Sequence, residues 1–201
     1  CAMNSLANGS ILKKSGFKNI YIQPAAYDAG GAIGAATYCA IINGDKIKKN
    51  KNTKLYLGPK FTNYDVSKIL DKYENTFKDK DIKVKKIENT SDLIDNIANL
   101  LIKKKIVGIF RDRLEWGARA LGNRSIIADP RGDQIKDKIN LKIKRRESFR
   151  PFAPMVLKKN LEDWFLVDRE IPSMMEVHKI KDEQKNIIPA VVHKDDTCRL
   201  Q

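Results

Sequence analysis

The chain has 201 residues, 42% of them apolar, which is enough to bury the core of one large domain or two small ones. Its longest weakly polar run, residues 29–42, is shorter than the roughly 20 apolar residues that a membrane-spanning helix needs, so no transmembrane segment is predicted. The net charge of +14 raises the question of nucleic-acid binding, because Lys and Arg neutralise phosphates.

The first elements expected along the chain are a strand and a helix. Residues 17–23 alternate and are rich in Ile and Tyr, which predicts a strand ended by Pro24. The small apolar residues 32–42 predict a buried helix with Asp28 as its cap. Residues 43–54 are polar and charged, as in a linker, so we expect a domain boundary there.

Short helices and strands alternate beyond that boundary. Residues 62–65, TNYD, predict a capping box on a helix that ends near Tyr73, and Ser91 is expected to cap a helix with apolar residues from Ile94 to Leu101. The other expected strands cover residues 82–87, 106–110, 125–128, 152–157, 174–178 and 189–193, with helices near 134–142 and 158–165. This mixture is typical of a mixed α/β domain with a twisted sheet.

The start of the sequence and its cysteines indicate the context of the chain. The first residues, CAMNSLANGS, have neither an initiator methionine nor the features of a signal peptide, so we expect a piece of a longer protein. Cys1, Cys39 and Cys198 form no CxxC pair, which favours a reducing, cytoplasmic setting. His193 and Cys198 lack partners at ligand spacing and only weakly indicate a metal site.

The arginines are gathered in one part of the chain. Eight of the ten lie between Arg111 and Arg150, whereas the 29 lysines are spread along the sequence. The planar guanidinium group binds phosphate and carboxylate oxygens in a bidentate way. The cluster therefore predicts a compact anion site rather than a diffuse basic surface.

The first part of the cluster is RDRLEWGARALGNRSIIADPR, residues 111–131, which follows the expected strand 106–110. A strand end is where a loop reaches a ligand, and this loop combines arginines with Gly, Asn and Ser, which allow close backbone approach and neutral hydrogen bonds. The alternative interpretation is an exposed loop whose arginines pair with Asp112, Glu115 and Asp129.

A second basic segment is NLKIKRRESFRPFAP, residues 140–154. Pro151 and Pro154 restrict the backbone near Arg150, and a rigidly presented charge suits ligand binding. The alternative is a basic helix end that complements the helix dipole.

Seven sequence blocks resemble those of one enzyme family and occur in the same order along the chain. They are residues 2–9, 23–36 (QPAAYDAGGAIGAA), 56–59 (YLGP), 114–131, 140–154, 171–180 (IPSMMEVHKI) and 188–201 (IPAVVHKDDTCRLQ). With these blocks the chain resembles the carbamoyltransferases of the NodU/CmcH group, and GARALGNRS and FRPFAP are the most specific of them.

The resemblance implies two domains. Residues 1–52 are expected to be the end of an actin/ASKHA-like carbamoyl-transfer domain, and residues 53–201 a YrdC-like domain truncated at its C-terminus. The YrdC-like domain is expected to make carbamoyl adenylate from carbamoyl phosphate and ATP, and the transfer domain to carbamoylate a hydroxyl group of a small-molecule acceptor.

The resemblance also implies an adenylating pocket. Its catalytic residues, around the phosphates, are expected to be Arg119, Lys144, Arg150 and Arg199. Met174 is expected near the adenine, and the pocket is lined by Asn123, Arg124 and Ser125. Mg²⁺ is expected with ATP, since it commonly accompanies nucleotide phosphates.

In the transfer domain, the resemblance implies that Asp28 completes an iron-type metal site and that Gly30 and Gly31 lie where the nucleotide approaches. The histidine ligands of that metal belong to an upstream segment in the family, so we expect this chain alone to bind the metal poorly.

The block HKDDT, residues 193–197, departs from the family pattern HVDGT. Asp196 stands at the usual glycine, which leaves the turn geometry open. Thr197 is expected to contact the ligand, and His193 is interpreted either as a hydrogen-bonding group of the pocket or as the end of a strand.

Two other functions remain open at this point. A basic RNA-binding module is one, because YrdC-like folds also occur in proteins of tRNA modification; aromatic residues are only 7% and do not alternate with basic ones, which disfavours it. The other is threonylcarbamoyl-adenylate synthesis from bicarbonate and threonine, which rests on fold resemblance alone.

Overall fold

The computed structural model describes residues 1–47, 55–132 and 134–201. These residues form two compact units, each described here by itself. Unit 1 combines residues 1–55 with 116–121 and 130–201, and unit 2 combines residues 56–115 with 122–129. The domain boundary predicted near residue 52 lies outside the described residues, and the two-domain division stays a prediction.

The described residues contain helices and short strands in mixed order, which confirms a mixed α/β composition. The α-helices are α1 (Ser5–Lys14), α2 (Asp28–Ile42), α3 (Asn63–Lys72), α4 (Glu74–Asp79), α5 (Thr90–Ile102), α6 (Gln134–Lys138) and α7 (Leu161–Trp164). The strands are β1 (Val107–Phe110), β2 (Arg124–Ile127), β3 (Val177–Lys179) and β4 (Thr197–Arg199). A π-helix, η1 (Ile139–Lys144), and four 3-10 helices complete the set: η2 (Lys158–Asn160), η3 (Pro172–Met174), η4 (Asp182–Gln184) and η5 (Pro189–Val191).

The core of unit 1 surrounds a small antiparallel sheet. β3 pairs with β4, with Val177 opposite Arg199 and His178 opposite Cys198. Backbone hydrogen bonds extend this pairing on both sides, since residues 164–166 bond to residues 179–181 and residues 154–156 bond to the last residue of the chain. One face of the sheet packs into an apolar cluster that contains Leu161, Phe165, Ile171, Ile180, Ile188, Val191, Cys198 and Leu200.

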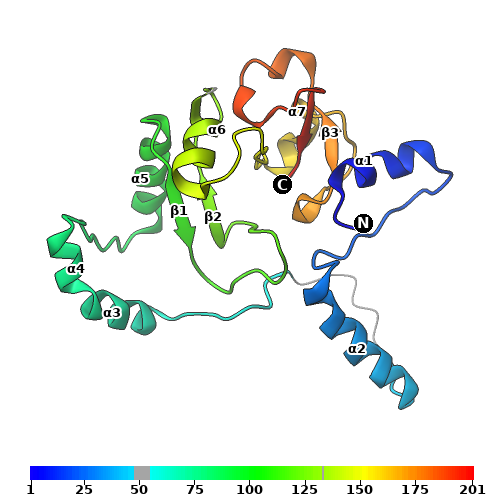
Figure 1. Ribbon diagram of the computed structural model, residues 1–201, viewed down its shortest axis with the longest axis horizontal. Coiled ribbons are helices and arrows are strands. Elements are labelled where there is room, and N and C mark those ends of the chain that lie inside the picture. Colours follow the sequence, from blue (N-terminus) through cyan, green and yellow to red (C-terminus); the bar gives the residue numbers. More distant parts are fainter. Residues whose placement is uncertain (48–54, 133) are drawn as a thin grey trace. The chain divides into compact units, whose positions relative to one another are not determined.

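Helix α1 packs directly on β3 within unit 1, and the two lie side by side in Figure 1. A Cβ atom on Gly9 would lie 2.2 Å from the carbonyl oxygen of Val177, so only glycine permits this approach. The buried Asn8 donates from Nδ2 to the carbonyl oxygens of Ala2 (2.8 Å) and Met175 (2.9 Å). The N-terminal helix is therefore an integral part of the fold around β3.

Unit 2 is built on the antiparallel pair β1–β2, in which Ile109 faces Ser125 and Phe110 faces Arg124. Helix α5 packs against β1, as Figure 1 shows. The segment 58–60 runs beside residues 113–114, with Gly58 and Leu114 joined by a backbone hydrogen bond of 3.0 Å. The rings of Phe61 and Phe110 lie 5.6 Å apart between centroids and add an apolar contact.

Several sequence predictions are confirmed. The capping box between Thr62 and Asp65 starts α3, and the helices expected near 134–142 and 158–165 are α6 with η1 and η2 with α7. The strands expected at 106–110 and 125–128 are β1 and β2. The helix after residue 89 is α5, but its cap is Asn89, whose side chain accepts from the amide of Ser91 at 2.8 Å, so Ser91 is not the cap.

Other sequence predictions are wrong. Residues 17–23, 82–87 and 152–157 form no strand, because an alternating pattern becomes a strand only where a neighbouring strand completes the hydrogen-bond ladder. The strand expected at 189–193 is the 3-10 helix η5, whose first residue, Pro189, has its φ angle fixed near helical values and lacks a donor. Of residues 174–178, only Val177 and His178 belong to β3.

Helix α2 differs from its prediction in two respects. The residue before its first turn is Tyr27, so Asp28 lies inside the helix and does not cap it. None of its residues is buried within the described part of the chain, although they are small and apolar. Apolar composition indicates a helix that can be buried, and burial itself requires a packed neighbour.

The described residues form two separate two-stranded sheets. The ASKHA-like and YrdC-like folds therefore stay predictions. No helix in the described ranges has the length and apolar character needed to cross a bilayer.

Candidate anion-binding site

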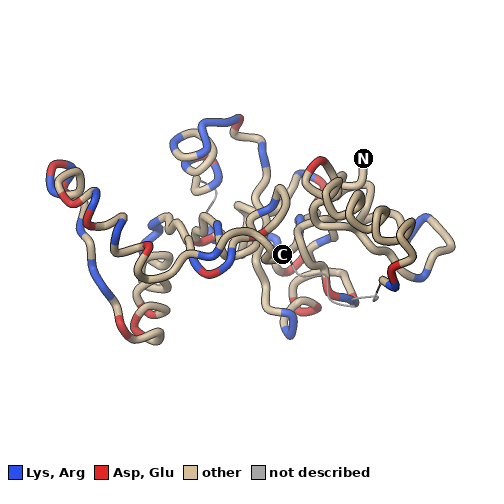
Figure 2. The backbone as a smooth tube through the Cα atoms, turned by 90° about the horizontal axis from the view of Figure 1, so that it is seen from below, with Lys and Arg blue, Asp and Glu red and all other residues tan. Residues whose placement is uncertain are grey.

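Three arginines from distant parts of the sequence gather in unit 1. Arg199 is the last residue of β4, Arg146 follows η1, and Arg119 belongs to the segment 116–121. We call these three residues the arginine cluster. Figure 2 shows Lys and Arg spread along the described residues with Asp and Glu between them, so the cluster is defined by the surroundings of its side chains and not by the density of charge.

The arginine cluster is electrostatically strained. Burial, together with the positive charges of Arg119 and Arg146, lowers the pKa of Arg199 to about 10. Burial and the charge of Arg150 also lower the pKa of Arg146, while Glu147 opposes this shift. Like charges held close together destabilise one another, and a bound anion would reduce that cost.

The hydrogen bonding of the cluster is incomplete. The Nε atoms of Arg119 and Arg199 are buried and have no hydrogen-bond partner among the described residues. Buried donors are ordinarily paired, so an unpaired pair of guanidinium donors indicates groups that are held for a ligand. A ligand with several anionic oxygens, such as a phosphate ester, matches both the charge and the donors.

The fold holds Arg146 rigidly. Its Nε donates to Oδ1 of Asn140 at 2.7 Å, and its guanidinium lies 5.0 Å from the centre of the Phe152 ring. Asn140 is fully buried and donates from Nδ2 to the carbonyl oxygens of Ser148 and Arg150 at 3.1 and 2.9 Å. The amide of Arg146 bonds back to the Asn140 carbonyl across the left-handed residue Arg145, which ends the helix.

The segment that carries Arg119 is anchored by Gly117. This residue has φ +112°, and a Cβ on it would meet the Pro24 carbonyl at 3.2 Å and Ala25 at 3.3 Å. Trp116 donates its amide to the carbonyl of Leu55 at 2.7 Å. A glycine is required at 117 both for the backbone angle and for the close approach, and the approach fixes the start of the Arg119 segment.

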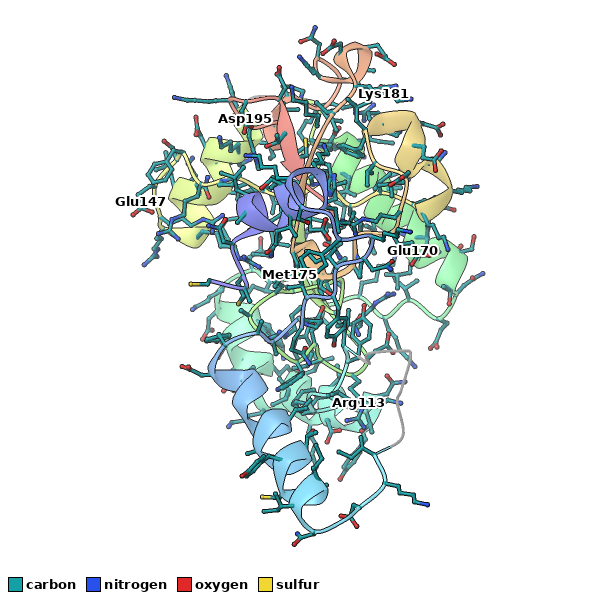
Figure 3. All side chains as sticks on the ribbon, turned by 90° about the vertical axis from the view of Figure 1, so that its right-hand side faces the viewer. Arg113, Glu147, Glu170, Met175, Lys181 and Asp195 are labelled. Atoms are coloured by element: carbon teal, nitrogen blue, oxygen red, sulfur yellow. The ribbon has the colours of Figure 1, made fainter. Side chains whose placement is uncertain are left out.

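His193 stands beside this cluster. Its Nδ1 lies 3.0 Å from Oγ1 of Thr197, which donates to Oδ1 of Asp195 at 2.7 Å; Asp195 is labelled in Figure 3. The other ring nitrogen, Nε2, is buried and has no hydrogen-bond partner among the described residues. Burial lowers the pKa of His193; Asp195 opposes that shift, and the charges of Arg199 and Lys136 add to it.

The turn between His193 and β4 is formed although Asp196 stands where the family pattern has glycine. Asp196 has φ +60°, the left-handed region in which glycine is favoured, and its carboxylate binds Nζ of Lys185 at 2.7 Å. The backbone bonds of the turn are formed, from His193 to the Thr197 carbonyl and from Asp196 to the His193 carbonyl. Aspartate tolerates this conformation better than most residues, so the substitution leaves the turn intact.

The remaining predicted phosphate ligands lie near the surface of unit 1. Lys144 is the exposed last residue of η1. Arg150 is exposed and pairs with Glu147 at 2.7 Å, but its charge acts on Arg146, so it is close to the cluster. Met174 is half-buried at the end of η3, where it and Ser173 both have positive φ angles, +54° and +73°.

Three predicted pocket residues belong to unit 2, where each forms a hydrogen bond or an ion pair. Asn123 donates from Nδ2 to the Arg113 carbonyl at 2.7 Å. Arg124 pairs through Nε with the buried Glu115 at 3.0 Å, and Ser125 accepts from the amide of Gly122 at 2.9 Å. Their contact with a ligand stays a prediction.

The residues expected to serve the transfer domain lie at the start of α2. A Cβ on Gly30 would be 2.2 Å from the Ala25 carbonyl, so this glycine is needed by the fold, whereas nothing lies within 4 Å of the corresponding position on Gly31. Asp28 opens the helix. Within residues 1–47, 55–132 and 134–201, no three His, Cys, Asp or Glu side chains are grouped to hold a metal ion.

Sequence reasoning missed one member of the cluster. Arg146 lies in the predicted basic segment, but nothing in its local sequence separates it from Arg145. The left-handed turn at Arg145 directs the two differently, and only Arg146 of the pair meets Asn140 and Phe152. The nearby buried Asn140, which follows the apolar Ile139, is the one signal that could have indicated it.

The described residues thus form a mixed α/β protein in which three arginines gather in unit 1. Comparison with known sequences identifies its family. Residues 98–201 match the carbamoyltransferase C-terminus, and residues 1–37 match the carbamoyltransferase N-terminus. The chain therefore belongs to the carbamoyltransferase family, which confirms the resemblance found in the sequence.

Similar proteins include nodulation proteins of rhizobia. The chain is 36% identical over 204 residues to nodulation protein NolO of Bradyrhizobium diazoefficiens, with all of this chain and 36% of that protein covered. It is 32% identical over 201 residues to nodulation protein U of Rhizobium tropici, with all of this chain and 32% of that protein covered. An uncharacterised protein of Synechocystis is 38% identical over 225 residues, with all of this chain and 35% of that protein covered. The chain thus spans about a third of the length of these relatives.

Proposed function

We propose that this chain supplies the adenylating part of an O-carbamoyltransferase. It takes carbamoyl phosphate and ATP, and with one water the products are carbamoyl adenylate, pyrophosphate and phosphate. The carbamoyl group then passes to a hydroxyl group of a small-molecule acceptor in the transfer domain. The observation that supports this proposal best is the arginine cluster, with its buried unpaired Nε donors on Arg119 and Arg199.

The chemistry needs such a cluster. Carbamoyl phosphate and ATP are both polyanions, and positive charge must offset their repulsion before they can react. Negative charge also develops on the departing pyrophosphate, and preorganised guanidinium groups stabilise it without further reorganisation. The cluster is preorganised, because Asn140 and Phe152 hold Arg146 and Gly117 anchors the segment of Arg119.

The other predicted residues take roles around this centre. Arg119, Arg146 and Arg199 bind the phosphates, and the exposed Lys144 and Arg150 add charge at the edge. Met174 contacts the adenine, and His193 and Thr197 contact the carbamoyl substrate. The roles of Asn123, Arg124 and Ser125 as pocket lining are part of the same proposal, as are Mg²⁺ on the nucleotide and the YrdC-like fold.

The metal of the transfer domain has no place in this scheme. Asp28 is a single carboxylate, and the described residues hold no group of three metal-binding side chains. Residues 1–47, 55–132 and 134–201 therefore do not fit an iron-type centre by themselves. No step is assigned to that metal, and the approach of a nucleotide to Gly30 and Gly31 stays part of the proposed transfer domain.

The test is a calorimetric titration of the chain with carbamoyl phosphate in the presence of the α,β-methylene analogue of ATP. The expected result is saturable binding that Arg199→Met weakens by about 2 to 5 kcal/mol, the cost of truncating a buried charged contact. Pyrophosphate release from ATP should also require carbamoyl phosphate.

The matched control is Arg113→Met. Arg113, labelled in Figure 3, is exposed and donates from Nη1 to the Gly58 carbonyl at 2.9 Å in unit 2. Its loss removes the same charge from the protein and should leave the affinity unchanged. If both substitutions weaken binding equally, and the affinity falls steeply as the salt concentration rises, the protein instead has a non-specific polyanion surface such as an RNA-binding face.

A further inference from the structure

The hydrogen bonds at His193 define which ring nitrogen carries the proton. The Thr197 hydroxyl lies 2.7 Å from Oδ1 of Asp195 and 3.0 Å from Nδ1 of His193. A carboxylate only accepts, so the single hydroxyl proton of Thr197 is directed to Asp195. Hydrogen bonding to Thr197 also lowers the pKa of Asp195, which keeps that carboxylate ionised.

The hydroxyl of Thr197 must therefore accept its bond from His193. This requires a proton on Nδ1, and in a neutral imidazole the other nitrogen is then an acceptor. The lowered pKa of His193 favours the neutral ring. Nε2 is thus a buried acceptor with no hydrogen-bond partner among the described residues.

An acceptor in this position is unusual for a site that binds anions. Arg199 on β4 and Lys136 on α6 both act on His193, and phosphate oxygens are matched by donors, not by a lone pair. A lone pair placed beside cationic groups instead matches a ligand that carries an N–H donor next to its anionic part. Carbamoyl phosphate has this combination, because the carbonyl carbon that carries its NH₂ group is bonded to an oxygen of the phosphate.

We propose that Nε2 of His193 accepts a hydrogen bond from the carbamoyl amide and so makes His193 the residue that selects carbamoyl phosphate over other acyl phosphates. This inference rests on the proposed function. Asp195 and the hydroxyl of Thr197 position His193, since their hydrogen bonds fix the proton on Nδ1 of its ring. Acetyl phosphate has a methyl group where carbamoyl phosphate has the amide, so it has nearly the same shape and charge and lacks the donor.

The experiment measures the affinities of carbamoyl phosphate and acetyl phosphate, each in the presence of the α,β-methylene analogue of ATP. We expect the wild-type chain to favour carbamoyl phosphate by about tenfold or more, because a buried polar group left unpaired is costly. His193→Leu should bring the ratio close to one by weakening only carbamoyl phosphate, while acetyl phosphate keeps its affinity.

Two further variants separate positioning from folding. Thr197→Val has nearly the same shape and removes the hydroxyl, so it should reduce the ratio with His193 still present. Thr197→Ser retains the hydroxyl and should restore the ratio. A general loss of structure would weaken both acyl phosphates equally and would not be reversed by serine.

The outcomes also separate this inference from the proposed function. If the wild-type chain binds neither acyl phosphate, the proposed function fails and the inference fails with it. If it binds carbamoyl phosphate and His193→Leu leaves the ratio unchanged, the inference is overturned while the proposed function stands. If His193→Leu weakens the binding of the ATP analogue and of neither acyl phosphate, the N–H group that bonds Nε2 belongs to the nucleotide. That result would also overturn the inference.

Discussion

The arginines of the two units differ in what surrounds them. In unit 2, Arg124 pairs with the buried Glu115 at 3.0 Å, Arg113 bonds the Gly58 carbonyl, and Arg111 bonds Oδ1 of Asn123 at 3.3 Å. In unit 1, the arginine cluster has like charges as its neighbours and two buried Nε atoms without a partner among the described residues. The arginines of unit 2 thus have hydrogen-bond acceptors, whereas those of the arginine cluster lie among like charges.

The difference lies in the supply of acceptors. Glu115 accepts from the amides of Asn123 (2.7 Å) and Arg124 (3.3 Å) and from the Arg124 side chain, so it ties β2 to the loop that follows β1. In the arginine cluster, Asn140 offers Arg146 a neutral oxygen, and the carboxylate of Glu147 pairs with Arg150. We expect a cationic group whose buried donors lack a partner among the described residues to be available for a ligand, whereas one paired with a buried carboxylate serves stability.

The largest effect is expected on removing the carboxylate of unit 2. Glu115→Ala leaves two amides and the charge of Arg124 without their acceptor, so the free energy of unfolding should fall by about 3 to 5 kcal/mol. Urea denaturation followed by circular dichroism measures this change. Glu74→Ala is the control, because Glu74 forms an exposed pair with Lys78 whose loss should leave the free energy of unfolding nearly unchanged.

Replacing an arginine should affect the free energy of unfolding differently in the two units. Arg124→Met leaves the buried Glu115 without its charged partner and should lower the free energy of unfolding by about 2 kcal/mol, because Arg124 itself is partly exposed. Arg199→Met removes a partly buried charge together with its repulsion from Arg119 and Arg146, so stability should be unchanged or higher. A comparable loss of stability in both variants would mean that Arg199 is a structural residue like Arg124.

The smallest effect is expected on the pH dependence of stability. The pKa of His193 is lowered in the folded chain, chiefly by burial, with Arg199 and Lys136 adding to the shift against Asp195. As the pH falls through the ordinary pKa of about 6.5, the unfolded chain takes up a proton first. His193 therefore contributes stability above that pH and loses it below. Melting curves between about pH 7.5 and pH 5.5 should show a shallower decline for His193→Leu than for the wild type.

Local signals in the sequence predicted the helices well. The capping box between Thr62 and Asp65 and the apolar period of α5 depend on residues a few positions apart, so the sequence contains all that they need. The strands at residues 17–23 and 152–157 depend on partners elsewhere in the chain, and there the pattern was insufficient. Residues 154–156 do bond to Gln201, but only through two backbone bonds, at 3.0 and 3.1 Å.

The site shows the same limit. Composition separated the arginine-rich stretch from the scattered lysines. Within residues 111–131, Arg124 pairs with Glu115, as the structural interpretation expected, while Arg119 joins the arginine cluster and its contact with a ligand stays a prediction. Arg146 belongs to the arginine cluster because Arg145 has a left-handed conformation. The residue types around Arg145 do not predict that conformation. The left-handed conformation of Asp196 could not be predicted either, because a glycine is the residue that normally indicates it.

The most direct test of the arginine cluster is thermal melting with increasing inorganic pyrophosphate at constant ionic strength. Binding to the folded state alone should raise the stability of the wild-type chain by about 1.4 kcal/mol for each tenfold increase above the dissociation constant. The melting temperature should rise in the wild type and in Arg113→Met and stay constant in Arg199→Met. An equal rise in all three would contradict it, because the anion would then bind without the arginine cluster.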